Sequence, residues 1–177
     1  LINTKGGFIW KAIIKNYHTY VEYVVENKNQ ELVLFSGDSS FYQLNFEHQN
    51  RKLNTRDFYF ETSEKAVVVT GGDESKTVKL VLKANTGGYI EFVYTIKSND
   101  YMIDFDVNVV NLDRDISGVG KGLEFAWEQV APDQEKSVEL QRQNATVFYY
   151  SEESGRDYLT ERSTYDSEQP EEALKWI

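Results

Sequence analysis

The sequence predicts an all-β sandwich with little helix. Short runs of alternating apolar and polar residues recur along the chain, and turn-forming residues separate them every 8 to 12 residues or so, roughly as in known sandwiches. The clearest case is a hairpin in which strands 89–96 and 101–110 flank the turn 97–100. The composition suits a packed core, since 40% of the residues are hydrophobic and 14% are aromatic. We therefore expect one ordered domain over residues 1–177.

The second strand of this hairpin has one apolar and one polar face. The apolar face carries Tyr101, Ile103, Phe105, Val107 and Val109. A period of two is typical of a strand with one solvated face. The first strand carries apolar residues on both faces, so we expect it to be covered on both sides.

The other strands are predicted from runs of β-branched and aromatic residues between turn signals. They cover residues 8–15, 20–25, 31–35, 41–46, 58–61, 66–70, 77–84, 123–130, 145–150 and 158–160. Runs 20–25 and 31–35 form a hairpin around a polar stretch. The turn 85–88 joins strand 77–84 to the central hairpin, because its Asn and Gly tolerate positive φ. Three consecutive strands thus form a meander.

Three polar stretches interrupt this pattern. Residues 47–56 are predicted to be a loop. Residues 133–142 are the best helix candidate, because Pro132 stands near their N-terminus. Residues 170–177 begin as a helix-like turn or feed a further strand.

The charge balance and the absence of cysteine limit the function. The chain has 29 Asp and Glu against 19 Lys and Arg, a formal net charge of −10, which disfavours nucleic-acid binding because that depends on basic residues. Without cysteine there are no disulfides, thiolate nucleophiles or Cys-based metal sites. No apolar run is long enough to span a membrane and no signal peptide is visible, so we expect the chain itself to be soluble.

Two motifs resemble ligand sites without meeting their requirements. Residues 117–122 lack the spacing of a phosphate-binding loop and precede a strand instead of a helix. Asn111, Asp113 and Asp115 have the spacing of a calcium loop, but the Gly and Glu that this loop then requires are absent. We interpret the two stretches as a loop and a capped turn, and we expect no cofactor and no metal.

Few side chains are candidates for chemistry. His18 and His48 have no identifiable partner, so we expect them on the surface or in loops. No Ser-His-Asp order or metalloprotease motif is present, and the Asn144-Ala145-Thr146 sequon occurs often by chance.

The tryptophans allow two interpretations. Trp10, Trp127 and Trp176 could stack on sugars, although a buried core role is commoner for this residue. Trp127 and the neighbouring Glu128 are the candidates for a binding groove in the sandwich. No catalytic residue is predicted.

Read end to end, the sequence resembles the large periplasmic domain of the bacterial YidC membrane protein insertase. The stretches that carry the resemblance are 3–7 with Ile9 and Tyr17, 32–35, 89–101, 106–111, 145–150 and 172–177. The most telling is the hairpin with Asp100-Tyr101 after its basic turn and Asn111 at its end.

The resemblance implies a twisted antiparallel super-sandwich similar to galactose mutarotase. It implies a non-catalytic accessory domain between the first two transmembrane helices of an inner-membrane protein, on the periplasmic face. The implied partners are the SecD–SecF complex, the SecYEG translocon and nascent membrane proteins. In the family the domain continues further, so residues 1–177 are expected to hold roughly its first two thirds and to leave an open sheet edge.

Two alternatives stay open from the residues alone. A carbohydrate-binding module would use Trp127 and Glu128 in the groove. A mutarotase-like sugar epimerase would need a histidine and a carboxylate that converge there, and His18 and His48 are the only histidines available.

Overall fold

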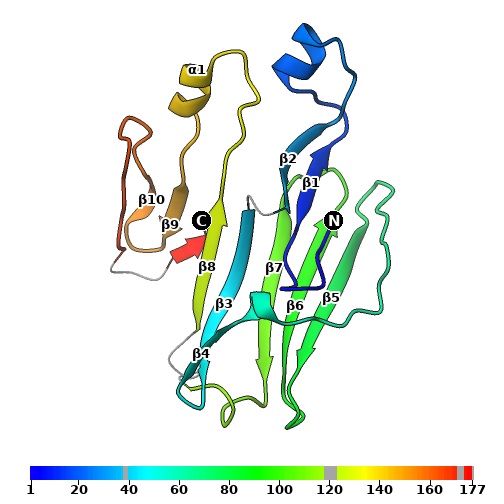
Figure 1. The fold of residues 1–177 in the computed structure, drawn as a ribbon, viewed down its shortest axis with the longest axis vertical. Coiled ribbons are helices and arrows are strands. Elements are labelled where there is room, and N and C mark those ends of the chain that lie inside the picture. The colour runs from blue at the N-terminus through cyan, green and yellow to red at the C-terminus, as the bar shows by residue number, and fades with distance from the viewer. Residues whose placement is uncertain (38–39, 118–122, 171–173, 177) are drawn as a thin grey trace. The chain divides into compact units, whose positions relative to one another are not determined.

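The computed structural model describes residues 1–37, 40–117, 123–170 and 174–176. It divides into two compact units, Leu1–Ala12 with Val33–Val130 and Ile13–Leu32 with Ala131–Ile177. The described residues form antiparallel sheets with little helix (Figure 1), which confirms the all-β prediction. The predicted loop at 118–122 and residues 171–173 of the C-terminal stretch lie outside the described residues.

The predicted meander is the main sheet of the first unit. Strands β5 (Ser75–Lys83), β6 (Tyr89–Lys97) and β7 (Ile103–Val110) lie in the order β5-β6-β7 (Figure 1). Tyr101 precedes β7 and is 79% exposed, so the apolar face begins later than predicted. The reason is local: the backbone N–H of Met102 donates to Oδ1 of Asp100, which extends the turn.

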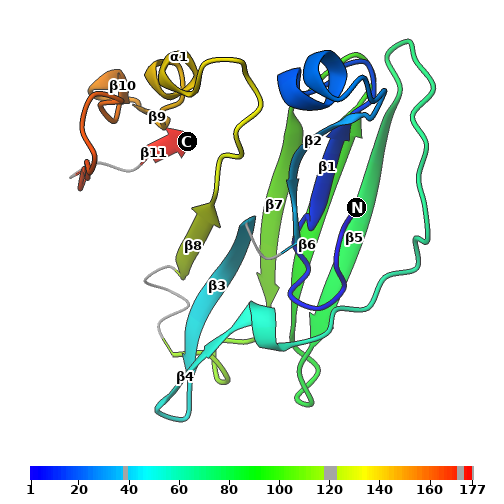
Figure 2. The same ribbon diagram turned by 45° about the horizontal axis from the view of Figure 1, so that its top comes forward.

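A second sheet of the same unit has the order β4-β3-β8, with β3 (Ser40–His48) in the centre and β8 (Glu124–Gln129) at one edge. The predicted loop at 47–56 is wrong, because it contains β4 (Arg51–Asn54), which pairs with β3 (Figure 2). Gln49 and Asn50 both have positive φ, as a two-residue hairpin turn requires. The sequence did not predict this strand because β4 consists mainly of polar residues.

The core of the first unit lies between these two sheets. It contains apolar side chains from both sheets and from the loops beside them, with Phe92 fully buried. Its members are Leu44, Phe60, Val78, Leu80, Ile90, Phe92, Tyr94, Leu112 and Ile116. Alternate residues of β6 are buried in it, and the residues between them are only partly buried, so the two faces of β6 are not covered equally.

Two short strands predicted between β4 and β5 do not form. Residues 58–61 make only isolated bridges, Lys5 with Tyr59 and Glu61 with Val81. Residues 66–70 form no strand, and Val68 is 66% exposed. Among the described strands none pairs with residues 66–70, so the high strand propensity of this β-branched run is not enough to form a strand.

The strand predicted over 20–25 is wrong. In its place stands η1 (Val21–Val25), a single π-helical turn. The hydroxyl of Thr19 accepts the backbone N–H of Glu22 and donates to the Glu22 carboxylate, a reciprocal cap that favours a helical turn over a strand. The predicted hairpin is therefore replaced by the pairing of β1 (Lys11–Ile14) with β2 (Leu32–Ser36).

The second unit also contains a small sheet of order β10-β9-β11, built from β9 (Phe148–Ser151), β10 (Gly155–Tyr158) and β11 (Leu174–Trp176). β9 overlaps the predicted strand 145–150, and β11 agrees with the strand alternative for 170–177, whereas β10 ends at Tyr158, where the predicted strand 158–160 begins. The predicted helix is shorter than expected, because α1 spans only Val138–Gln143. Ser137, not Pro132, caps it: the Ser137 hydroxyl accepts the backbone N–H of Leu140.

Candidate functional site

An apolar groove of about 500 Å³ opens in the first unit beside β7 and β8. We call it the β7–β8 groove. Its lining side chains are Leu44, Phe105, Val107, Val109, Leu123 and Phe125. The lining comes from the inward faces of both sheets, so the groove is an uncovered part of the sandwich interior.

Two strand edges border this groove. Among the described strands, β7 and β8 each stand at the end of their sheet. Phe125 of β8 is 44% exposed although it lies opposite the buried Leu44 on β3. Exposed apolar surface beside open strand edges is typical of an interaction site.

Trp127 and Glu128 lie on opposite faces of β8. Trp127 pairs with Tyr42, whose side chain points to the core, and it is 55% exposed on the same face as Phe125. Glu128 pairs with Phe41 and therefore points to the other face. Of the two predicted groove residues, the structure places Trp127 on the groove side and does not bring Glu128 to it.

A second hollow, of about 430 Å³, lies in the first unit and is lined by the β3–β4 hairpin, the β5–β6 turn and the loop after β7. We call it the end pocket. Its walls are mainly apolar and include Phe46, Phe58, Leu82, Ile90, Leu112 and Ile116. Its polar lining includes His48, Thr86 and Asp115.

The two histidines are in different units, and among the described residues neither is bonded to a carboxylate. Nδ1 of His48 lies 2.5 Å from the backbone oxygen of Asp115, whose carboxylate accepts the Thr86 hydroxyl at 2.7 Å. His18 contacts the backbone oxygen of Gln30 through Nδ1, and its ring stacks on Tyr23. Sequence inspection gave no sign that His48 meets Asp115, because 67 positions separate them.

Residues 111–115, which the sequence indicates to be a capped turn and not a calcium loop, form a turn. The backbone N–H groups of Asp115 and Ile116 both donate to the Leu112 oxygen, and Asn111 has positive φ. Within the part of the chain that the structure describes, no group of three or more His, Asp and Glu is placed to hold a metal ion.

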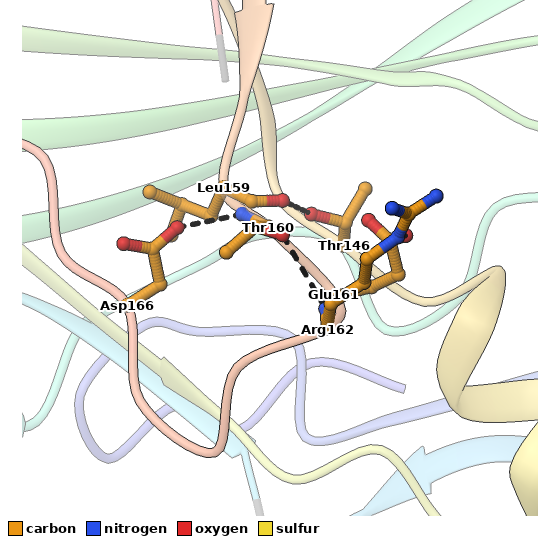
Figure 3. Close-up of polar contacts among 6 residues, drawn as sticks. All are labelled: Thr146, Leu159, Thr160, Glu161, Arg162 and Asp166. Carbon is orange, nitrogen blue, oxygen red and sulfur yellow. Dashed lines mark hydrogen bonds and ion pairs between the residues drawn. The ribbon is translucent and has the colours of Figure 1, made fainter.

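Several polar contacts lie in and beside the loop after β10 in the second unit (Figure 3). The Asp166 carboxylate accepts the backbone N–H of Thr160 at 2.6 Å, and the Thr146 hydroxyl donates to the Leu159 oxygen. Arg162 forms an ion pair with Glu161 at 3.4 Å, with the Arg162 side chain 88% exposed. Exposed pairs of this kind contribute little stability, so we interpret the cluster as one that shapes the loop.

Comparison with known families identifies the chain. The sequence pattern of the YidC periplasmic domain matches residues 1–177. The chain belongs to this family. The sequence of this periplasmic domain is 33% identical to the membrane protein insertase YidC of Azobacteroides pseudotrichonymphae. It is 30% identical to the membrane protein insertase YidC of Parabacteroides distasonis, and both alignments cover 99% of the chain. No solved structure matches it.

The periplasmic domain spans only part of these relatives. It covers 26% of the length of the Azobacteroides and Parabacteroides proteins, and also 26% of the Bacteroides fragilis insertase, to which it is 28% identical. None of the helices in the described part of the chain is long and apolar enough to cross a membrane. The match of the family pattern to residues 1–177 confirms the YidC resemblance noted in the sequence.

Proposed function

We propose that this periplasmic domain is a non-catalytic accessory part of a multi-pass insertase, on the periplasmic face of the bacterial inner membrane. In this proposal it assists the insertion and folding of inner-membrane proteins by binding other proteins. The β7–β8 groove is the observation that supports it most strongly. Family membership supplies the setting, since the relatives are membrane protein insertases.

The groove has what an extended polypeptide needs. The edges of β7 and β8 offer backbone donors and acceptors for pairing, and Phe105, Val107 and Phe125 offer apolar contacts for every second side chain. None of the described residues that line it is charged, so an apolar strand meets no unpaired charge from them. We propose components of the Sec machinery, SecD–SecF and SecYEG, as the bound proteins, with nascent membrane proteins reached through the full-length insertase.

Co-purification from membranes tests this role. We expect Sec components to co-purify with the full-length insertase, and to be lost when Phe125 is replaced by Ser. The matched control is Tyr165→Ser, which changes a side chain that is 78% exposed in the second unit and should leave co-purification intact. Sec components that co-purify equally well with an insertase lacking residues 1–177 would contradict the proposal.

A carbohydrate-binding module is the second candidate, because Trp127 presents an exposed indole ring beside the groove. Calorimetric titration with sugars tests this candidate. If no heat of binding is measured at millimolar sugar concentrations, the candidate is eliminated. A mutarotase-like epimerase is the related alternative. Unchanged anomerisation after replacement of both His18 and His48 would eliminate it.

A further inference from the structure

The end pocket has the size and walls of a small-ligand site. Its volume of about 430 Å³ is in the range of such sites, roughly 300 to 1,000 Å³. Ile90 and Leu112 on its wall are core residues that are 2% and 4% exposed. Phe46 and Phe58 stack with ring centroids 6.3 Å apart, and they add aromatic surface to the wall. Such a wall favours an aromatic ligand.

The polar lining is fixed by hydrogen bonds between segments that are far apart in the chain. His48 is bound to the Asp115 backbone, and Thr86 donates to the Asp115 carboxylate. The backbone N–H of Ser117 donates to the Glu47 oxygen, which ties the same loop to β3. The polar groups are therefore held in place before any ligand binds.

This arrangement leaves hydrogen-bond acceptors free to meet a ligand. A backbone oxygen can only accept, so Nδ1 of neutral His48 carries the proton and donates to Asp115. Nε2 of the same ring is then an acceptor. The Thr86 hydroxyl already donates its one hydrogen bond to the Asp115 carboxylate, so it can only accept further hydrogen bonds. A ligand with one O–H or N–H donor fits these groups.

The charges at the pocket disfavour an anionic ligand. Lys83 is paired with Glu61 at 2.5 Å, which offsets its charge, and Asp115 repels anions. A sugar would place many hydroxyl groups against apolar walls, where unpaired polar groups are costly. A neutral, mostly apolar ligand with a hydrogen-bond donor fits the walls and these acceptors, and the amide groups of Gln49 and Asn85 also line the pocket.

We infer that the end pocket binds a neutral aromatic group that carries one hydrogen-bond donor, a phenol or an indole. Such a group is found in free aromatic molecules and in the tyrosine and tryptophan side chains of polypeptides. The inference is independent of the β7–β8 groove and of the Sec partners.

Ligand-observed NMR on the intact protein tests this site with p-cresol, and with toluene as the matched ligand that lacks the donor. We expect p-cresol to bind about fivefold more tightly than toluene, which corresponds to one net hydrogen bond of about 1 kcal/mol. Ala84→Leu, which fills the pocket, should weaken both ligands. His48→Leu should remove the preference for p-cresol while toluene still binds. Phe125→Ser, in the β7–β8 groove, is the control and should change neither.

Two further probes distinguish the sources. If N-acetyl-tyrosinamide binds as well as p-cresol, the pocket accepts a polypeptide side chain. If p-cresol alone binds, the pocket takes a free aromatic molecule. The inference is overturned if the folded protein binds neither p-cresol nor indole at millimolar concentration, or if Ala84→Leu leaves their binding unchanged.

Discussion

The hydroxyl of Tyr42 donates to the hydroxyl of Tyr94 over 2.6 Å, and this bond joins the two sheets of the first unit. Tyr94 in turn donates to the Gly7 oxygen at 2.6 Å, and Tyr42 accepts the backbone N–H of Ile9 at 3.0 Å. One chain of hydrogen bonds thus fastens the N-terminal segment to β3 and β6. Tyr94 is 1% exposed, so no water replaces these partners easily.

Removal of the Tyr94 hydroxyl should destabilise the protein. Tyr94→Phe leaves the partly buried Tyr42 hydroxyl without its acceptor and the Gly7 oxygen without its donor. We expect a loss of about 1 to 3 kcal/mol in the free energy of unfolding, measured by denaturant titration. The same change at Tyr101, which is 79% exposed, is the control and should have little effect. Equal losses at the two positions would show that the hydroxyl pair contributes nothing special.

The same pair predicts a loss of stability in alkali. Burial raises the pKa of Tyr42 to about 12 and also raises the pKa of Tyr94. Between the unfolded pKa of 10.0 and the folded pKa, the unfolded state loses its proton while the folded state keeps it, so stability falls as pH rises. The contribution of the tyrosine pair to the denaturant midpoint should be constant below pH 10.0 and should fall above it, with Tyr42 alone contributing about 1 kcal/mol one unit higher.

The control for this pH dependence is Tyr42→Phe, which should reduce the alkaline loss by the Tyr42 contribution, while Tyr94 still titrates above its unfolded pKa. Absorbance of tyrosinate in the folded protein provides an independent measurement. If Tyr42 titrates with the exposed tyrosines, burial does not raise its pKa.

Gly7 is predicted to tolerate no side chain. It has φ of +72°, and an added Cβ would lie 2.9 Å from Cδ2 of Phe92. Gly7→Ala should reduce the free energy of unfolding by about 2 to 4 kcal/mol, from the strained backbone and the overpacked core together. Gly71 also has positive φ but has open space around it, so Gly71→Ala should show only the backbone part. Similar losses for both variants would contradict the close packing at Gly7.

Phe105 tests which face of β7 is buried. Its ring packs against Tyr94 at 4.8 Å and against Tyr42 and Phe92 at 5.2 Å between centroids. Phe105→Ala should lower the thermal midpoint and reduce stability by about 3 kcal/mol. Tyr101→Ala, two positions before β7 begins, should change it little. An unchanged thermal midpoint of the Phe105→Ala variant would show that the opposite face of β7 is the buried one.

The sequence predicts the parts of the fold in which local pattern and tertiary pairing agree. Strands β5 to β7 combine a period of two with Gly- and Asn-containing turns, so their meander is predicted nearly residue by residue. β4 was missed because its pairing depends on two positive-φ residues, Gln49 and Asn50, and not on apolar content. At 20–25 the β-branched run predicts a strand, but the hydrogen bond between Thr19 and Glu22 stabilises a helical turn instead.

The candidate sites were less predictable. Trp127 and Glu128 are neighbours in sequence, and adjacent residues of a strand point to opposite faces, so only one of them faces the groove. The end pocket brings together residues from the β3–β4 hairpin and from the loop after β7, which no local pattern connects. Such a site is visible only in the folded structure, because its residues are far apart in the sequence.

The alternation at β8 also provides the most direct test of the proposed interaction role. A photo-crosslinking residue is placed at Trp127, on the groove face, and separately at Glu128, on the opposite face, in the full-length insertase in living cells. The β7–β8 groove as a protein-binding site predicts crosslinks to a Sec component from position 127 and none from position 128. Equal crosslinking from both positions, or crosslinks from 127 only within the same polypeptide, would contradict it.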